Sequence, residues 1–212
     1  MTVISPTITA SEAHDYRTQI EQVQQFAKRL HIDLSDGLFA PSRTINPIQV
    51  WWPEGAVADV HLMFHHPEDQ LETLISLKPS LVILQAEAEG EVARTLKGLK
   101  DVGVKVGVAL LQATTVDSAA ELIKSADHVL IFSGNLGYQG GGQVDLKLLD
   151  KVAQIKAINP SAEISWDGGV NDSNVAALAK GGIDVIYTGG FIQHADNPSG
   201  AYAILEASVN SV

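Results

Sequence analysis

The sequence predicts a (β/α)8 TIM barrel, a closed parallel eight-stranded sheet surrounded by helices. Three observations lead there: β-rich apolar runs alternate with stretches of helical period, this happens eight times, and the chain has 212 residues. Dividing 212 by 8 gives 26.5 residues per unit, enough for a strand, a helix and two short loops. An open doubly wound sheet would be expected to carry GxxxxGK[ST] or, after the first strand, GxGxxG, and neither pattern is present. We therefore expect one barrel domain over residues 1–212.

The individual elements are predicted from the two-residue alternation of strands and the helical period of about 3.6 residues. Strands are expected to begin near Val3, Leu30, Ala58, Ser80, Lys105, His128, Glu163 and Asp184. Helices are expected over Tyr16–Arg29, Glu68–Leu77, Glu91–Lys100, Ser118–Ser125, Leu146–Ala157 and Val175–Ala179. In the first helix, Ile20 and Val23 fall on one face, as an amphipathic helix requires. Pro47 and Pro53 leave room for little helix in the segment Asn46–Trp52.

Composition excludes several classes of function. With 14 Lys and Arg against 25 Asp and Glu, the formal charge is −11, which argues against binding to a nucleic-acid backbone. The absence of cysteine excludes a thiolate nucleophile and any cysteine-ligated zinc or iron–sulfur site. No apolar run approaches the length of a membrane span, and the N-terminus lacks a secretory apolar stretch. We therefore expect a cytoplasmic protein with no nucleic-acid partner and no membrane partner.

Polar and apolar side chains alternate in three of the expected strands. His31 and Asp33 share one face of the second strand, while the apolar residues between and after them share the other. Because the apolar face suits the helix layer, His31 and Asp33 are expected to point into the barrel. The same reasoning points His61 and Met63 inward from the third strand, and Asp167 inward from the seventh.

Two histidines and two carboxylates at one barrel mouth form a normal donor set for a divalent transition metal. A lone inward histidine is more often a hydrogen-bonded core residue, but two buried carboxylates together need compensating positive charge. The set His31, Asp33, His61 and Asp167 therefore predicts a metal site. Zinc, iron(II), manganese and cobalt all suit these donors, so the identity of the metal stays open.

Glycines follow the last three expected strands. They lie in the loop Gly137–Gly142 after the sixth strand, in Gly168-Gly169 after the seventh and in Gly189-Gly190 after the eighth. Residues without a side chain let backbone N–H groups approach an anion, and barrels often bind phosphate after strands seven and eight. A single glycine pair would more simply make a tight turn. Three adjacent strand ends with glycine favour a phosphate site.

Six segments carry a family resemblance: Ile4–Ile8, His31–Pro41, Asp59–Met63, Gly107–Leu110, Gly137–Gly142 and Asp167–Val170. The second is similar to the signature H-x-D-x-M-D-G-x-F-x-P, and the third matches D-x-H-L-M. Taken in this order over nearly the whole chain, the segments resemble the ribulose-phosphate 3-epimerases of the pentose phosphate pathway. Any one of them alone would be a weak signal, but the ordered set is specific.

The resemblance implies an isomerase that inverts C3 of a phosphorylated ketose, converting D-ribulose 5-phosphate to D-xylulose 5-phosphate. It implies that His31, Asp33, His61 and Asp167 bind one divalent metal ion, and that Asp33 and Asp167 are also the acid/base pair. Two such groups would flank a planar ene-diolate that the metal stabilises as a Lewis acid. The resemblance also implies assembly into a homo-oligomer.

The same resemblance implies which residues contact the substrate. Thr7, in the family's serine position, and Met63 would line the substrate pocket. The phosphate site would be built from Gly141, Gly142, Gly168, Gly169, Gly189 and Gly190. Gly137, in the same loop as the first two, is also expected to bind substrate.

Several positions depart from the family pattern. Ser35 and Phe132 stand where methionine is usual, Gln85 stands where histidine is usual, and Gly190 stands where serine is common. None of these removes a proposed ligand, but they change the shape and polarity of the pocket. A hexulose phosphate such as allulose 6-phosphate therefore stays open as the substrate, and so does a relative that binds a sugar phosphate without turning it over. A Schiff-base aldolase would need an inward lysine at a strand end, and the Asp-x-Lys-x-x-Asp pattern of related lyases is absent from His31–Asp36.

Overall fold

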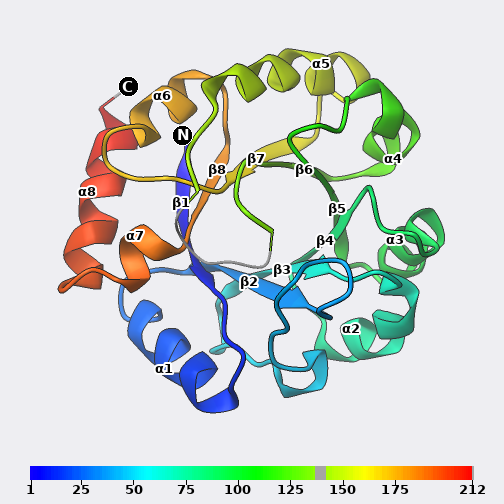
Figure 1. The fold of residues 1–212 in the computed structure, drawn as a ribbon, viewed down its shortest axis with the longest axis horizontal. Coiled ribbons are helices and arrows are strands. Elements are labelled where there is room, and N and C mark those ends of the chain that lie inside the picture. Colours follow the sequence, from blue (N-terminus) through cyan, green and yellow to red (C-terminus); the bar gives the residue numbers. More distant parts are fainter. Residues whose placement is uncertain (137–141, 212) are drawn as a thin grey trace.

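The computed structural model describes residues 1–136 and 142–211 and contains the expected barrel (Figure 1). Its strands close in sequence order, with every neighbouring pair parallel. They are β1 (Val3–Ile8), β2 (Arg29–Ser35), β3 (Val57–Met63), β4 (Leu81–Gln85), β5 (Lys105–Leu110), β6 (His128–Phe132), β7 (Glu163–Asp167) and β8 (Val185–Thr188). The eight expected strands are confirmed, each beginning within one residue of its predicted start.

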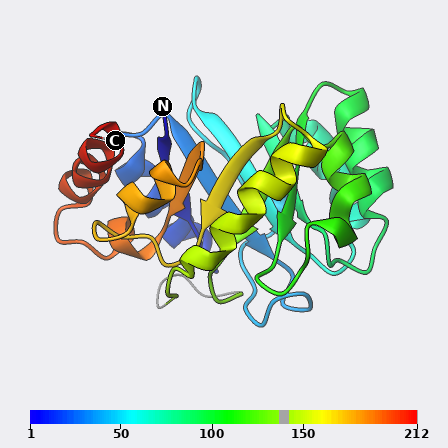
Figure 2. The same cartoon turned by 90° about the horizontal axis from the view of Figure 1, so that it is seen from above.

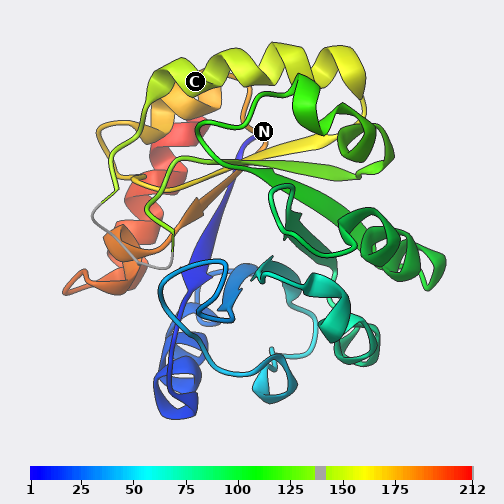
Figure 3. The same cartoon turned by 45° about the vertical axis from the view of Figure 1, so that its right-hand side comes forward.

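Helices cover the outside of the barrel (Figures 2 and 3). They are α1 (Ala13–Val23), α2 (Leu71–Leu77), α3 (Val92–Asp101), α4 (Ala120–Ser125), α5 (Asp150–Ile158), α6 (Val175–Lys180), α7 (Gly190–Gln193) and α8 (Pro198–Asn210). Short 3-10 segments occupy Pro47–Gln49, Pro67–Gln70, Asp117–Ala119 and Leu146–Leu149. The connection from β2 to β3 thus has only a 3-10 turn in the segment where prolines predicted little helix. Within the described residues, no helix is long and apolar enough to cross a membrane.

The expected first helix, Tyr16–Arg29, is wrong at both ends, because α1 begins at Ala13 and ends at Val23. The N–H groups of Phe26 and Ala27 both return to the carbonyl oxygen of Val23, at 3.2 and 2.9 Å, which closes the turn. Arg29 is then the first residue of β2. The predicted helix ran too far because the helical pattern of apolar residues continues in the sequence beyond Val23, where the chain turns back toward β2.

The helices after β8 were not expected. The longer one, α8, begins at Pro198, and the side chain of Asn197 caps it by accepting a hydrogen bond from the N–H of Gly200 at 3.1 Å. Proline at the first helical position and asparagine before it are ordinary start signals. Tyr202, Leu205 and Val209 form the buried stripe of this helix, which packs against β1 and α1.

The hydrophobic core has two parts. The larger lies between the outer face of the sheet and the helices, and it includes Ile32, Leu34 and Trp166, all fully buried. The smaller lies inside the barrel and consists of Leu81, Ile83, Ala109, Leu130, Val185 and Tyr187. The alternation read from the sequence is therefore confirmed: apolar residues of β2 and β7 face outward, which leaves their alternate positions for polar groups.

The end of the barrel where the strands begin holds a ring of charged and polar side chains. Arg29 Nε donates to Asp59 Oδ2 at 2.6 Å, and the Arg29 guanidinium donates to both Glu163 oxygens at 2.9 and 2.7 Å. Glu163 Oε2 lies 2.8 Å from His128 Nδ1. The Tyr187 hydroxyl closes the ring, donating to Asp59 Oδ2 at 2.8 Å and lying 3.3 Å from His128 Nε2. The ring joins β2, β3, β6, β7 and β8 through side chains.

Candidate metal and active site

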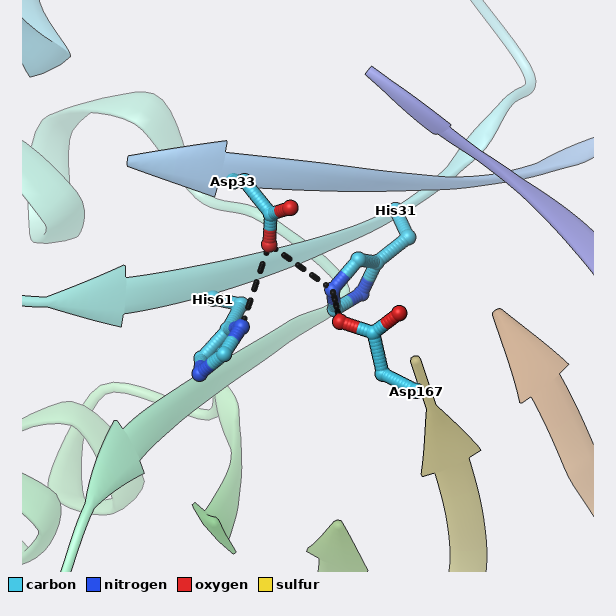
Figure 4. Close-up of side chains that lie close together, drawn as sticks. All are labelled: His31, Asp33, His61 and Asp167. Atoms are coloured by element: carbon cyan, nitrogen blue, oxygen red, sulfur yellow. Dashed lines mark hydrogen bonds and ion pairs between the residues drawn. The ribbon is translucent and has the colours of Figure 1, made fainter. Parts of the chain in front are cut away.

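Four side chains converge at the end of the barrel where the strands finish: His31, Asp33, His61 and Asp167 (Figure 4). Each offers one ligand atom, and these atoms all lie within 4.8 Å of one another. Asp33 Oδ1 is 3.1 Å from both His31 Nε2 and His61 Nδ1. Asp167 Oδ2 is 3.9 Å from His31 Nε2. The predicted donors thus form one cluster.

Strand register brings these residues together. In the parallel pairing of β2 with β3, Asp33 lies opposite His61. Since neighbouring strands are about 4.8 Å apart, inward side chains at paired positions come within contact distance. Asp167 is the last residue of β7, and the closed sheet carries it around to the same mouth with β8 and β1 between it and β2.

Neighbouring side chains hold three of the four donors. The ring of Tyr187 stacks on that of His31, with centroids 3.7 Å apart and an interplanar angle of 22°. The hydroxyl of Thr9 donates to Asp33 Oδ2 at 3.0 Å. The side-chain amide of Gln85 contacts His61 Nε2 at 2.9 Å. These supports leave the donor atoms facing one another.

His31 shows the clearest need for a further partner. Its side chain is fully buried, and neither ring nitrogen makes a well-aligned hydrogen bond within the described residues, although Asp33 lies close to Nε2. A buried polar atom without a partner is costly unless a ligand satisfies it. Burial also lowers the pKa of His31, which favours the neutral imidazole that can ligate a metal.

The two carboxylates differ in proton affinity. Burial alone would raise the pKa of Asp33, but the neighbouring imidazoles of His31 and His61 outweigh it and hold that pKa well below its ordinary value. Burial, followed by the negative charge of Asp33, raises the pKa of Asp167 well above its ordinary value. These directions describe the chain by itself, and a bound cation would lower the proton affinity of both groups.

A cavity of about 290 Å³ opens above the cluster. Asp33 and Asp167 reach its wall, as do the expected substrate residues Thr7 and Met63. Of the expected phosphate residues, the wall includes Gly142, Gly168, Gly169, Gly189 and Gly190. Gly137 and Gly141 were also predicted to bind substrate, but they lie outside the described residues.

Close backbone packing accounts for two of these glycines. Gly168 has φ +109°, and a Cβ there would lie 2.0 Å from the backbone nitrogen of Gly134. Gly169 has φ +74°, and a Cβ there would lie 2.7 Å from the carbonyl carbon of Gln143. Both positions therefore need glycine for backbone reasons, whether or not an anion binds there.

The departures from the family pattern have different consequences. Phe132 lines the cavity, so it changes the wall of the pocket. Ser35 is not among the residues that line the cavity, and its hydroxyl donates to the carbonyl oxygen of Ser42 at 2.7 Å, which holds the loop after β2. Gln85 is fully buried, contacts the metal-ligand candidate His61 and is not among the residues that line the cavity.

Sequence reasoning missed several residues that shape the site. Thr9 and Tyr187 both line the cavity. Each could have been found from alternation: Thr9 follows Thr7 by two residues, and Tyr187 follows the inward Val185 by two. Asn171 and His194 also reach the wall, but from loops where no periodic signal exists.

Comparison with known proteins adds independent information. A model of the ribulose-phosphate 3 epimerase family matches residues 3–193. The chain is 32% identical over 196 residues to the ribulose-phosphate 3-epimerase of Helicobacter pylori, with 89% of each chain covered. It is 28% identical over 213 residues to that of Schizosaccharomyces pombe, with 97% of this chain and 93% of the relative covered.

Solved structures show the same architecture at lower identity. KGPDC from Streptococcus mutans matches with a TM-score of 0.75 and 13% identity, covering 100% of this chain and 99% of that one. The 3-hexulose-6-phosphate synthase from Salmonella typhimurium matches with a TM-score of 0.67 and 14% identity, covering 99% of each chain. At such identity the likeness concerns the barrel fold alone.

Proposed function

The chain belongs to the ribulose-phosphate 3-epimerase family, and from this premise we propose that it interconverts D-ribulose 5-phosphate and D-xylulose 5-phosphate. One observation carries the proposal: two carboxylates, Asp33 and Asp167, reach one cavity from different strands and share a cluster with two imidazoles. Inversion at C3 needs one group to remove a proton from one face and another to deliver a proton to the opposite face. A pair of carboxylates on two separate strands suits this task.

A divalent metal fits the cluster formed by His31, Asp33, His61 and Asp167. The donor set is two imidazole nitrogens and two carboxylate oxygens, and a ligand would satisfy the ring nitrogens of buried His31, which make no well-aligned hydrogen bond within the described residues. When bound, such a metal would supply Lewis-acid stabilisation of the negative charge that develops on the substrate oxygens. Its identity among zinc, iron(II), manganese and cobalt is left open by these donors.

The protein groups account for the proton transfers. One carboxylate takes the C3 proton and leaves a planar ene-diolate, and the protonated carboxylate on the other side returns a proton to C3. Because Asp33 and Asp167 lie on separate strands and both reach the cavity, one can act as the base while the other acts as the acid. In the reverse direction the two residues exchange roles.

The substrate phosphate would bind at the glycine-rich side of the cavity, beside Gly142, Gly168, Gly169, Gly189 and Gly190. No lysine or arginine lines the part of this cavity that the structure describes. Recognition there would therefore depend on backbone N–H groups and neutral side chains such as Asn171. Anchoring the phosphate away from the reacting carbon holds C3 between the two carboxylates.

Proton exchange at C3 tests the function directly. Protein loaded in turn with each of the four metals is incubated with D-ribulose 5-phosphate in D2O, and NMR follows deuterium entering C3 and xylulose 5-phosphate forming. Allulose 6-phosphate is run in parallel, because Phe132 replaces methionine at the pocket wall. Exchange with the hexulose phosphate alone would assign that substrate instead, and no exchange with either would reject the epimerase proposal.

Removing either carboxylate should abolish turnover. We expect Asp33→Asn and Asp167→Asn each to lower kcat by at least about a hundredfold, the lower end for loss of a general acid or base. Because both residues are also ligand candidates, metal content is measured by elemental analysis on the same samples. The exposed Asp101→Asn is the control and should keep wild-type kcat. Turnover by a fully metallated Asp33→Asn variant at the wild-type rate would rule out the proposed acid/base pair.

A further inference from the structure

Gln85 is the last residue of β4, and its completely buried side chain lies beside His61 of the candidate metal site. Its Nε2 contacts His61 Nε2 at 2.9 Å. Its Oε1 is also buried and makes no hydrogen bond within the described residues. A buried amide whose nitrogen donates a hydrogen bond while its oxygen accepts none carries an energetic cost, which calls for an explanation.

The contact determines which nitrogen of His61 carries the proton in the chain by itself. An amide nitrogen can only donate, so His61 Nε2 must accept and must be unprotonated. The ring proton is then on Nδ1, which donates to Asp33 Oδ1 at 3.1 Å. Gln85, His61 and Asp33 thus form a chain of donors directed toward the carboxylate.

Metal ligation requires the opposite tautomer. Nδ1 is the nitrogen of His61 that faces the cluster, and it must offer a lone pair in order to ligate. The proton then lies on His61 Nε2. There it would face the NH2 group of Gln85, and two hydrogen-bond donors in contact repel each other. A half-turn of the amide exchanges its oxygen and nitrogen within almost the same volume, and it brings the unpartnered Oε1 to Nε2.

We propose that Gln85 is a positioning residue for the metal: its amide turns when the metal binds, and its carbonyl oxygen holds His61 in the ligating tautomer. The inference rests on the metal site of the proposed function. The side chain at position 85 then sets metal affinity without touching the metal or the substrate. Hydrogen bonds of this kind to a ligating histidine commonly change metal affinity by about 10- to 100-fold.

Zinc affinity of position-85 variants tests the proposal without reference to catalysis. Dissociation constants for Zn²⁺ are measured by competition with a chromophoric chelator. Gln85→Leu, which removes the acceptor, should weaken zinc binding by about 10- to 100-fold. Gln85→Glu, which keeps an acceptor and cannot donate, should bind zinc at least as tightly as the wild type. Gln85→Met serves as the acceptor-free variant if the leucine variant fails to fold.

The control is Asn159, a buried amide that donates to the carbonyl oxygens of Ile123 and Ala126, on the helix side of the sheet. Asn159→Leu should lower thermal stability and leave zinc affinity unchanged. A loss of less than about tenfold in Gln85→Leu, or a Gln85→Glu variant as weak as Gln85→Leu, would overturn the proposal.

NMR gives a second measurement, the tautomer of His61, which would not change with zinc if Gln85 had only a structural role. Two-bond ¹H–¹⁵N correlations of the imidazoles identify the protonated nitrogen of His61. We expect the proton on Nδ1 in zinc-free protein and on Nε2 after zinc is added. A proton already on Nε2 in zinc-free protein would contradict the inference.

The outcomes separate this inference from the proposed function. Wild-type protein that binds zinc, combined with unchanged affinity in the variants, rejects the role of Gln85 and leaves the epimerase proposal intact. The expected order of affinities in a protein that exchanges no C3 proton supports the role of Gln85 and rejects the epimerase. A wild-type protein with no affinity for zinc rejects both the role of Gln85 and the metal site.

Discussion

At the scale of single residues, the site depends on a close approach between the backbones of Gly168 and Gly134. Gly168 lets the end of β7 pass the end of β6 so closely that any side chain would meet the backbone of Gly134. Asp167, one residue earlier, is placed at the cavity wall by this contact. Glycine at position 168 is therefore needed to keep the Asp167 carboxylate at the cavity wall.

Substituting Gly168 tests this directly. We expect Gly168→Ala to lower the free energy of unfolding by more than about 3 kcal/mol, because a left-handed φ and a backbone clash act together. Gly103→Ala is the control, since Gly103 also has a left-handed φ but has nothing within 4 Å of its Cβ position. It should cost only about 1–2 kcal/mol. Urea denaturation measures both, and equal losses would mean that the clash is relieved by movement of the backbone.

At the scale of elements, a buried cation fixes one helix to the loop after β5. Lys151 in α5 is buried, and its Nζ donates to the carbonyl oxygens of Leu111, Gln112 and Thr114 at 2.8, 3.2 and 2.8 Å. Burial lowers the pKa of Lys151, an effect that the negative charge of Glu87 partly opposes. The lysine thus links α5 to three carbonyl groups of this loop.

Removing this amine should destabilise the loop. We expect Lys151→Met to lower the free energy of unfolding by about 1–3 kcal/mol, because three hydrogen bonds to the loop are lost while the apolar stem is kept. Lys147→Met, at an exposed position of the preceding 3-10 turn, should change stability by less than about 0.5 kcal/mol. Chemical denaturation of the two variants makes the comparison. A Lys151→Met variant as stable as Lys147→Met would show that water satisfies the carbonyls.

At the scale of the whole molecule, the ring at the start of the strands closes the barrel from within. Five strands contribute Arg29, Asp59, His128, Glu163 and Tyr187, and Tyr187 also stacks on His31 of the candidate metal site. The same tyrosine thus belongs to a structural network and to the floor of the site. The expected extent of one domain over residues 1–212 and the expected homo-oligomer stay predictions, which limited proteolysis and light scattering would test.

The ring also predicts how stability depends on pH. Burial alone would raise the pKa of Glu163, but hydrogen bonds from His128 and Arg29 outweigh it and lower the pKa well below the ordinary value of 4.5. In the window below 4.5 the unfolded chain therefore binds more protons than the folded chain. Stability from Glu163 is fully present above that value and is lost as the pH falls toward the folded-state pKa.

Glu163→Gln isolates this contribution. We expect the variant to be less stable at neutral pH and to lose stability less steeply than the wild type as the pH falls below about 4.5. Urea denaturation at a series of pH values gives the slope of unfolding free energy against pH for the variant and for the wild type. Glu54→Gln, an exposed carboxylate for which the described residues provide no ion-pair partner, should keep the wild-type slope. Identical slopes for Glu163→Gln and the wild type would contradict the assigned role of the ring.

The amino-acid sequence was enough to predict the strands, their inward and outward faces, and the two histidines and two aspartates that meet at the barrel mouth. Alternation along a strand is a local property, so it placed His31, Asp33, His61 and Asp167 on the polar faces of their strands, and the predicted barrel made those faces the inward ones. It could not determine that Tyr187 stacks on His31, or that Gln85 offers its amide to His61. It also could not place the end of α1, because helical periodicity continued where the chain turns. These features were decided only by the tertiary structure, because closure of the barrel and the register between strands set which distant residues meet.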